Sequence, residues 1–210
     1  RQIGQLLRVL REAGVAPPDR ADLEAELRLS PELVDALLMQ GPVVEVAAGL
    51  LYDRDTLDRL VGDMLTLAGA QDGHLVHPGP IDLHDFFEDL RRDLPLYGER
   101  GFSVAGVAGT LSADRDRITQ VLHNLVRNAV AHTEPGGRIA VTATANGGRL
   151  RIAVRDDGPG IPADQLEAIF ERFHRVDPGR SRDSGGTGLG LAIARALTEA
   201  HGGTIVAHSP

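Results

Sequence analysis

The chain has 210 residues, of which 42% are hydrophobic and 25% are charged, a balance typical of folded globular proteins and not of disordered tails. Its formal net charge of −8 opposes broad attraction to nucleic acid or anionic lipid, because both need clustered positive charge. The absence of Cys excludes disulfides, thiol catalysis and cysteine zinc sites, and all 22 basic residues are Arg, which excludes the Lys-dependent phosphate sites of Walker-type and eukaryotic-type kinases.

The first quarter of the chain predicts three helices followed by two short strands. The helices are expected over residues 6–13, 21–29 and 31–40, and the strands over residues 43–46 and 50–52. Ser30-Pro31 is typical of a helix start, with Ser as the N-cap and Pro in the first turn, and Gly41 is a typical helix end. Because only small residues separate the two strands, they are expected to form a hairpin.

Two stretches, "LREAGVAPP" and "GLLYDRDTL", bracket this part of the chain, and with them residues 6–57 resemble one winged-helix repeat of the selenocysteine-specific elongation factor. The helix that would enter a nucleic-acid groove carries Glu32 and Asp35 and no Arg. Residues 1–60 hold seven Arg against eleven Asp and Glu. Because this charge would repel phosphates, we expect a structural or protein-contact module and no nucleic-acid partner.

A second pattern begins near Asp55, where six apolar residues form one stripe of a helix. They are Leu57, Leu60, Val61, Met64, Leu65 and Ala68. Such a stripe is typical of a helix that dimerises or binds a partner. Gly73 would end this helix, and residues 78–80 would form a linker. A further helix is expected over residues 81–94 and a strand over residues 102–107.

Residues 117–132 predict an amphipathic helix that carries two asparagines one turn apart. Asn124 and Asn128 lie within about 40° of each other around the helix axis, at the edge of the apolar face. Amides in this position can offer oxygens to a hard cation and N–H donors to a phosphate. The pair therefore predicts a ligand site more than an ordinary polar surface.

Two strands joined by Ala145-Asn146-Gly147-Gly148 follow, and this turn is a strong hairpin signal. In the second strand, even-numbered apolar residues from Leu150 to Val154 alternate with polar or small ones, so the even positions should face the core. Asp156 continues the even series, and a buried carboxylate would need a partner such as the amino group of a ligand. Gly158 and Gly160 would let the backbone approach a flat ring closely.

The segment Gly186-Thr187-Gly188-Leu189-Gly190 follows a polar stretch that resembles a loop and leads into a helix expected over residues 191–200. Free backbone N–H groups and the positive helix end would face an anion there. A glycine-rich segment alone is weak support for a phosphate site. Here the glycine-rich segment follows the asparagine pair and the turn that begins at Asp156. The three segments in this order predict an ATP site that needs no Lys.

Four ordered motifs, "HNLVRNAVAHT", "DDGPGI", "IFERFHRVD" and "GGTGLGLAI", resemble the asparagine box, the two glycine boxes and the phenylalanine box of bacterial sensor histidine kinases. Residues from about 57 to 210 resemble the second dimerisation helix and the catalytic ATP-binding domain of that family. The resemblance implies an α+β chain with a winged helix (1–56), a dimerisation-type helix and linker (57–80), and a two-layer α/β sandwich of the Bergerat type (81–210).

The resemblance also implies roles for individual residues. Asn128 would be the Mg²⁺ ligand, Asn124 would lie near the γ-phosphate, and Asp156 would recognise adenine. The other residues expected at the ATP are His132, Gly158, Gly160, Ile161, Phe173, Arg175, Gly186, Thr187, Gly188, Leu189 and Gly190. Phe170 and Phe173 would anchor the loop, and Arg172 or Arg175 would reach the phosphates.

The function implied is the catalytic portion of a protein-histidine kinase, which transfers the γ-phosphoryl group of Mg·ATP to a histidine. None of the eight His residues has the usual phosphoacceptor setting, and Ala131 stands where the family commonly has a basic residue. The winged-helix segment also stands where the phosphoacceptor helix should be. Two alternatives therefore stay open: a nucleotide-binding interaction or scaffold protein with little phosphotransfer, and an anti-sigma-type serine kinase.

The resemblance implies a homodimer, with a response regulator or a separate phosphoacceptor domain as the partner. It also implies a cytoplasmic location, either free or as the cytoplasmic part of a membrane-bound parent. The longest apolar stretch, residues 43–52, contains Glu45 and is far too short to cross a bilayer, so we expect no membrane contact from this segment.

Overall fold

The computed structural model describes residues 2–71, 76–176 and 187–209. The chain divides into two compact units, one of residues 1–65 and 177–188 and one of residues 66–176 and 189–210.

The first unit consists of three helices and a hairpin. Its elements are α1 (Gln2–Ala13), α2 (Arg20–Leu27), α3 (Pro31–Gln40), β1 (Val43–Ala47) and β2 (Leu50–Asp53), and the two strands are antiparallel. The three predicted helices and the hairpin are confirmed. The second helix ends two residues earlier than expected, because Arg28 takes the left-handed conformation and closes it.

Local sequence signals explain where α3 begins and ends. The Ser30 hydroxyl accepts a hydrogen bond from the Leu33 N–H at 3.3 Å, and Gly41 closes the helix with φ of 91°. The core of the unit is made of eight buried apolar residues: Leu6, Leu10, Leu23, Leu29, Val34, Leu37, Val43 and Leu51. The helices of this unit therefore owe their packing to the apolar positions that predicted them.

A buried carboxylate connects α1 to the start of α4 (Arg54–Gln71). Asp53 is 2% exposed, and its carboxylate accepts hydrogen bonds from Arg11 Nε at 3.1 Å and from Thr56 N and Oγ1 at 3.1 and 2.9 Å. These partners offset the cost of burying the charge. Along α4, Met64 and Leu65 of the predicted apolar stripe are 53% and 67% exposed.

The second unit contains a three-stranded sheet and a two-stranded sheet. The larger sheet has the order β4 (Gly101–Ala105), β6 (Arg138–Asn146), β7 (Arg149–Asp156); β4 runs parallel to β6, and β6 runs antiparallel to β7. The smaller sheet pairs β3 (Gly79–Asp82) with β5 (Thr110–Ala113) in antiparallel fashion.

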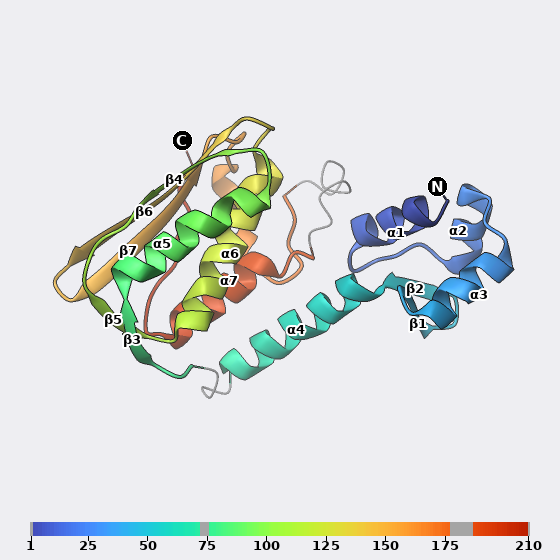
Figure 1. The fold of residues 1–210 in the computed structure, drawn as a ribbon, viewed down its shortest axis with the longest axis horizontal. Helices are drawn as coiled ribbons and strands as arrows, with labels where there is room; N and C mark the ends of the chain where they lie inside the picture. The colour runs from blue at the N-terminus through green and yellow to red at the C-terminus, as the bar shows by residue number, and fades with distance from the viewer. Residues whose placement is uncertain (1, 72–75, 177–186, 210) are drawn as a thin grey trace. The chain divides into compact units, whose positions relative to one another are not determined.

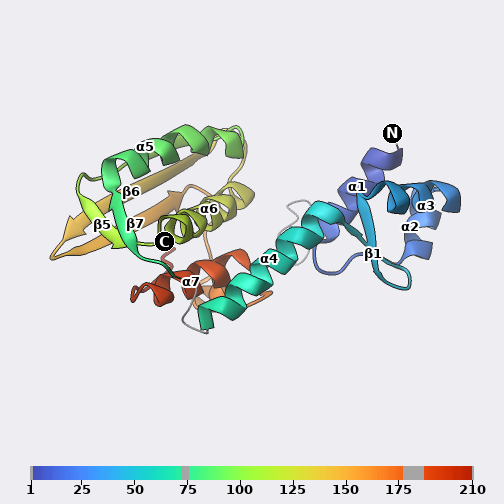
Figure 2. The same cartoon turned by 60° about the horizontal axis from the view of Figure 1, so that its bottom comes forward.

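Helices cover one face of the larger sheet (Figures 1 and 2). They are α5 (Leu83–Asp93) and α6 (Arg115–His132), and α7 (Gly190–Ala200) packs against α6. The unit also contains three single turns of 3₁₀-helix, η1 (Leu94–Tyr97), η2 (Ala163–Gln165) and η3 (Ala168–Phe170). This mixed α/β arrangement agrees with the predicted sandwich. Every helix in the described ranges is too short or too polar to span a lipid bilayer.

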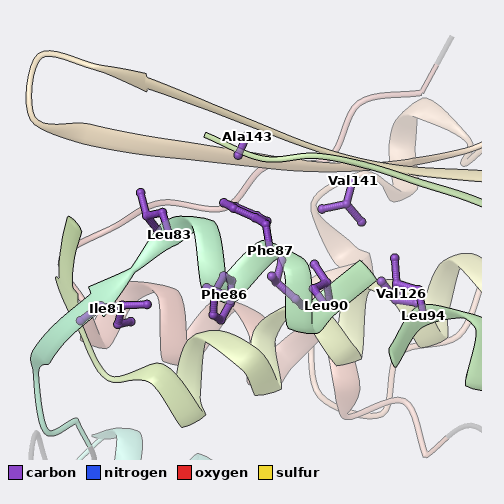
Figure 3. Close-up of a cluster of buried hydrophobic side chains, with 11 residues drawn as sticks. Ile81, Leu83, Phe86, Phe87, Leu90, Leu94, Val126, Val141 and Ala143 are labelled. Atoms are coloured by element: carbon purple, nitrogen blue, oxygen red, sulfur yellow. The ribbon is translucent and has the colours of Figure 1, made fainter. Parts of the chain in front are cut away.

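The core of the second unit lies between the sheet and α5 with α6. Figure 3 shows Val141 and Ala143 of β6 turned toward Phe87 and Leu83 of α5. The buried cluster comprises Ile81, Leu83, Phe86, Phe87, Leu90, Leu94, Ala113, Leu122, Val126, Val141 and Ala143. Because alternate residues of β6 point into this core, the intervening residues lie on the opposite face of the sheet.

Two sequence expectations for this unit are wrong. Residues 79–82 form strand β3 and not a linker followed by a helix, and β5, its partner, was not predicted. Helix α5 starts only at Leu83, because the Asp82 carboxylate accepts hydrogen bonds from His84 N at 2.9 Å and Asp85 N at 3.2 Å and so caps it. Residues 203–209, which follow α7, belong to no helix or strand.

Candidate nucleotide site

Helix α6 carries both asparagines, and Asp114 fixes its beginning. The Asp114 carboxylate accepts hydrogen bonds from Asp116 N at 3.1 Å and Arg117 N at 3.2 Å, and from His77 N at 2.9 Å. Burial alone would raise the pKa of Asp114, but the three N–H donors outweigh it and lower that pKa. The three donors therefore favour the ionised form of this N-cap.

The end of α6 is held by a side chain that no sequence motif indicated. Arg100 Nη2 donates to the Thr133 carbonyl at 2.7 Å and to the Val130 carbonyl at 3.2 Å, and Arg100 Nε donates to Thr133 O at 3.1 Å. The buried Thr133 hydroxyl donates in turn to Ala129 O at 2.6 Å. A cation at a helix C-terminus satisfies carbonyls that lack helical partners and complements the helix dipole.

The two asparagines are half-buried, as expected for the edge of the apolar face. The Nδ2 of Asn124 is buried without a hydrogen-bond partner among the described residues. The first residue of α7, Gly190, lies beside it, since a Cβ built on Gly190 would be 3.7 Å from Asn124 Oδ1. The side chain of Asn128 makes no hydrogen bond within the part of the chain that the structure describes. Both amides are thus available to a ligand.

The turn after β7 contains the predicted adenine-recognising acid. Asp156 is exposed, which corrects the expectation of a buried carboxylate at the end of the even-numbered row. The row itself alternates as predicted, but the strand ends at Asp156 and the chain leaves the core there. Oδ1 of Asp156 accepts a hydrogen bond from Gly158 N at 2.9 Å. Its second oxygen is free in the described structure to accept a hydrogen bond from a ligand.

Asp157 stabilises the same turn from the other side. Its carboxylate accepts hydrogen bonds from Arg138 N at 2.8 Å and Arg138 Nε at 3.4 Å. The backbone hydrogen bond from Arg138 is the main reason why the pKa of Asp157 is lowered. The turn is therefore attached to the start of β6 as well as to the end of β7.

Gly158 brings this turn against the end of α6. A Cβ on Gly158 would lie 2.6 Å from the His132 carbonyl oxygen and 2.7 Å from Asp156 Oδ1, closer than a real Cβ comes. Gly160 has φ of 80°, where glycine is favoured, and Ser209 Oγ would be 2.7 Å from a Cβ there. Ser209 Oγ also accepts a hydrogen bond from Ile161 N at 2.8 Å.

The segment after the turn carries the two phenylalanines expected to anchor the loop. Phe170 is buried, with the Arg195 guanidinium 5.5 Å above its ring. Phe173 is 50% exposed with φ of 62°, so it does not pack as an anchor in this structure. Arg175 is half-buried and makes a contact, while Arg172 is exposed.

The glycine-rich segment enters α7 as predicted. Gly188 has φ of 70°, Leu189 is buried, and the Leu189 carbonyl accepts the first helical hydrogen bond, from Ile193 N at 2.9 Å. Thr187 is half-buried and has contacts of its own. Gly186 lies outside the described residues. The α7 N-terminus lies next to Asn124, which puts its free N–H groups near the asparagine helix.

The structure thus brings together residues from three distant parts of the sequence. Asn124 meets Gly190, and the carbonyl of the exposed His132 meets Gly158. Sequence reasoning missed Arg100 and Ser209, which support these elements from positions 33 and 48 residues away from their partners. No local pattern could have indicated either residue, because their roles depend on contacts made only in the folded chain.

Residues 113–210 match the family described as histidine kinase-, DNA gyrase B-, and HSP90-like ATPases. Among curated proteins, the signal transduction histidine-protein kinase BaeS of Escherichia coli (strain K12) is 37% identical over 173 residues, which are 79% of this chain and 37% of BaeS. The probable sensor histidine kinase TcrY of Mycobacterium tuberculosis is 36% identical over 170 residues, covering 80% of this chain and 36% of TcrY. The chain thus spans little more than a third of the length of these relatives.

Among solved structures, full-length ShkA in complex with AMPPNP has a TM-score of 0.57 and 30% identity, covering 98% of this chain and 41% of ShkA. These findings define the C-terminal part of the chain as an ATPase domain of the histidine kinase, gyrase B and HSP90 class. Within that class, the curated relatives that are similar to this chain over about four fifths of its length are sensor histidine kinases.

Proposed function

We propose that this chain is the ATP-binding catalytic portion of a two-component sensor histidine kinase and offers the γ-phosphoryl group of Mg·ATP to a histidine outside the segment. The observation that carries the proposal is the buried Nδ2 of Asn124, which lacks a hydrogen-bond partner in the described structure and lies beside the first residue of α7. An unpaired buried donor costs free energy of about 1–3 kcal/mol. A phosphate oxygen held at the helix N-terminus would satisfy it.

The remaining predicted residues fit the same ligand. Asp156 has a carboxylate oxygen available to accept from the amino group of adenine, and Gly158 and Gly160 keep the turn thin enough for a ring to approach. His132 and Ile161 flank this turn, at the end of α6 and after Gly160. Phe173 and Arg175 precede the glycine-rich segment, and Gly186 to Gly190 would wrap the phosphates.

A magnesium ion would reach this site together with the nucleotide. Within the described ranges, no group of three His, Asp or Glu side chains could hold a metal by itself. Asn128 offers one amide oxygen on α6, and Mg²⁺ binds readily through one protein ligand with phosphate oxygens and water. Asn128 would therefore orient the ion, and the phosphates would supply most of its negative ligands.

The chemistry that these residues support is positioning and charge neutralisation. ATP supplies the phosphoryl group, and an acceptor imidazole nitrogen would attack the γ-phosphorus as ADP leaves. The α7 N–H groups and Asn124 would hold the phosphates, and Asn128 would keep the cation between them. ShkA was solved with AMPPNP, which supports a nucleotide at the equivalent fold.

The test is calorimetric titration of ATP with Mg²⁺ into the wild type, Asp156→Asn and Asn128→Ala. We expect each substitution to weaken binding more than about tenfold, or about 1.4 kcal/mol. Asp164→Asn and Asn146→Ala, two matched changes at exposed positions, should leave the affinity unchanged. Absence of ATP binding in a folded wild type would contradict the proposal.

A second candidate is a nucleotide-binding interaction protein with little phosphotransfer. Like the kinase proposal, it is compatible with the exposed apolar residues of α4, namely Val61, Met64 and Leu65, which a partner helix would bury. Radiolabelled ATP, added with and without a separate phosphoacceptor fragment, separates the two candidates, because only the kinase predicts labelled histidine. Labelled serine on a partner would instead favour the anti-sigma-type serine kinase.

The kinase proposal also includes partners, domain boundaries and a location. The exposed α4 stripe favours a homodimer through residues 57–80, and a response regulator or phosphoacceptor domain would receive the phosphoryl group. The order of three helices and a hairpin supports a winged-helix-like module over residues 1–56, followed by the catalytic domain over 81–210. A cytoplasmic location follows from the use of ATP in signal transduction.

A further inference from the structure

The outer face of the β4–β6–β7 sheet carries a row of three arginines. In β7 the residues that point away from the core are Arg149, Arg151, Ala153 and Arg155, and all four are exposed. In both views of the ribbon, helices lie against the opposite face of this sheet (Figures 1 and 2). Because the helices that pack on this sheet, α5 and α6, lie on its inner face, these three guanidinium groups stand on the exposed outer face of the unit.

The neighbours of the arginines across the sheet are small. Arg155 is paired with Ala140, Arg151 with Thr144, and Ala153 with Thr142. A shallow depression of about 250 Å³ is lined by Thr142, Thr144, Arg151 and Ala153. Small side chains therefore surround the arginines on the outer face of β6 and β7, and they leave the guanidinium groups accessible to a partner.

None of the three arginine side chains makes an ion pair or hydrogen bond within the described residues. Arg138, at the other end of β6, differs because it pairs with Asp157. Residues two apart on one face of a strand are separated by about 7 Å, so Arg149 and Arg151 repel each other without a compensating carboxylate. Nothing in the fold of this unit requires three positive charges in this row.

The charge of the row contrasts with that of the whole chain. The chain carries a formal net charge of −8, whereas the outward-facing positions of β7 from Arg149 to Arg155 carry three arginines and no carboxylate; the next outward-facing carboxylate, Asp157, is already paired with Arg138. Arginine is well suited to bind carboxylates, because its planar guanidinium donates two parallel hydrogen bonds to both oxygens of one carboxylate. A partner with carboxylates at strand-like spacing would match the row.

We propose that the outer face of β6 and β7 is a docking surface for a carboxylate-rich protein surface, recognised by Arg149, Arg151 and Arg155. Anionic lipid is the weaker partner, because its recognition usually takes about four to eight clustered basic residues. Nucleic acid is also weaker, since the net charge of −8 repels a long polyanion and the face has no aromatic side chain. The docking surface contains none of the residues assigned to ATP, so the docking proposal can be tested independently of the proposed nucleotide site.

The test uses the whole chain labelled with ¹⁵N and a poly-L-glutamate peptide as the probe. At low salt, we expect the amide signals of Thr142 and Ala153 to shift on titration. The charge-reversal variant Arg149→Glu, Arg151→Glu, Arg155→Glu should bind the peptide at least about tenfold more weakly. A matched variant with three reversals on helices, Arg8→Glu, Arg59→Glu, Arg92→Glu, should retain more of the affinity.

A folding control keeps the result interpretable, because three reversals on one strand could disturb the sheet. Arg149→Gln, Arg151→Gln, Arg155→Gln removes the charges without adding repulsion and should also lose the β6 and β7 shifts while circular dichroism stays that of the wild type. The proposal is overturned if the peptide leaves Thr142 and Ala153 unshifted or if both reversal variants lose affinity equally. It is also overturned if phosphatidylserine vesicles or duplex DNA shift these signals and poly-L-glutamate does not.

Discussion

Replacing Gly158 with Ala should damage both the stability of the second unit and its binding of ATP. The new Cβ would lie 2.6 Å from the His132 carbonyl oxygen and 2.7 Å from Asp156 Oδ1. The first of these is backbone at the end of α6 and cannot rotate away, so either the turn or the helix end must move. Overpacking of this kind typically costs about 1–3 kcal/mol. For a unit of this size, that lowers the melting temperature by about 2–4 °C per kcal/mol.

Gly79→Ala is the matched control for this substitution. It makes the same chemical change in strand β3 of the same unit, but nothing lies within 4 Å of the added Cβ. Its effect on the unfolded chain is the same, so the difference between the variants isolates the contact of Gly158 with His132. Thermal unfolding followed by circular dichroism measures the stability, and calorimetry with Mg·ATP measures the affinity. If the two variants melt together and bind ATP equally, the close approach of the turn to α6 is refuted.

Three further substitutions test the supports of the site and the core. Asp114→Asn keeps a side-chain oxygen at the N-cap but removes its charge, so it should lower the free energy of unfolding by about 0.3–1 kcal/mol at pH 7. Because the pKa of Asp114 is lowered in the folded state, the contribution of the charge disappears as the pH falls through the folded pKa, and urea unfolding curves of the two proteins should converge in acid. Arg100→Ala should lower the free energy of unfolding by about 1–3 kcal/mol, because it leaves the Thr133 carbonyl without its hydrogen-bond donor. Arg100→Lys should restore part of this stability. Equal urea midpoints for the wild type and both variants would contradict this role of Arg100. Phe87 is 2% exposed, and Phe87→Ala should lower the free energy of unfolding by about 3–5 kcal/mol. Leu96 is 83% exposed, and Leu96→Ala should change the free energy of unfolding by no more than about 0.5 kcal/mol. If urea unfolding shows similar changes for both variants, the assignment of the core is wrong.

Local signals predicted the helices well because each signal acts within a few residues. Ser30 caps α3 through a hydrogen bond to Leu33, three positions away, and the apolar positions of α6 are those that became buried. Strands β3 and β5 escaped prediction because each is stabilised by the other across 28 or more positions. Strand β2 is equally short, but its partner β1 precedes it directly and the turn between them indicates a hairpin.

The sequence by itself determined which residue types belong to the candidate site and in what order they occur. Two asparagines on one helix, a glycine turn after a strand and a glycine-rich helix entry are local patterns, and each lies on the predicted element. Only the tertiary structure decided that Gly190 meets Asn124, that Gly158 touches the carbonyl of His132, and that Asp156 is exposed. These outcomes depend on how α6, α7 and β7 pack together, and packing between elements distant in sequence leaves no periodic signal in the chain.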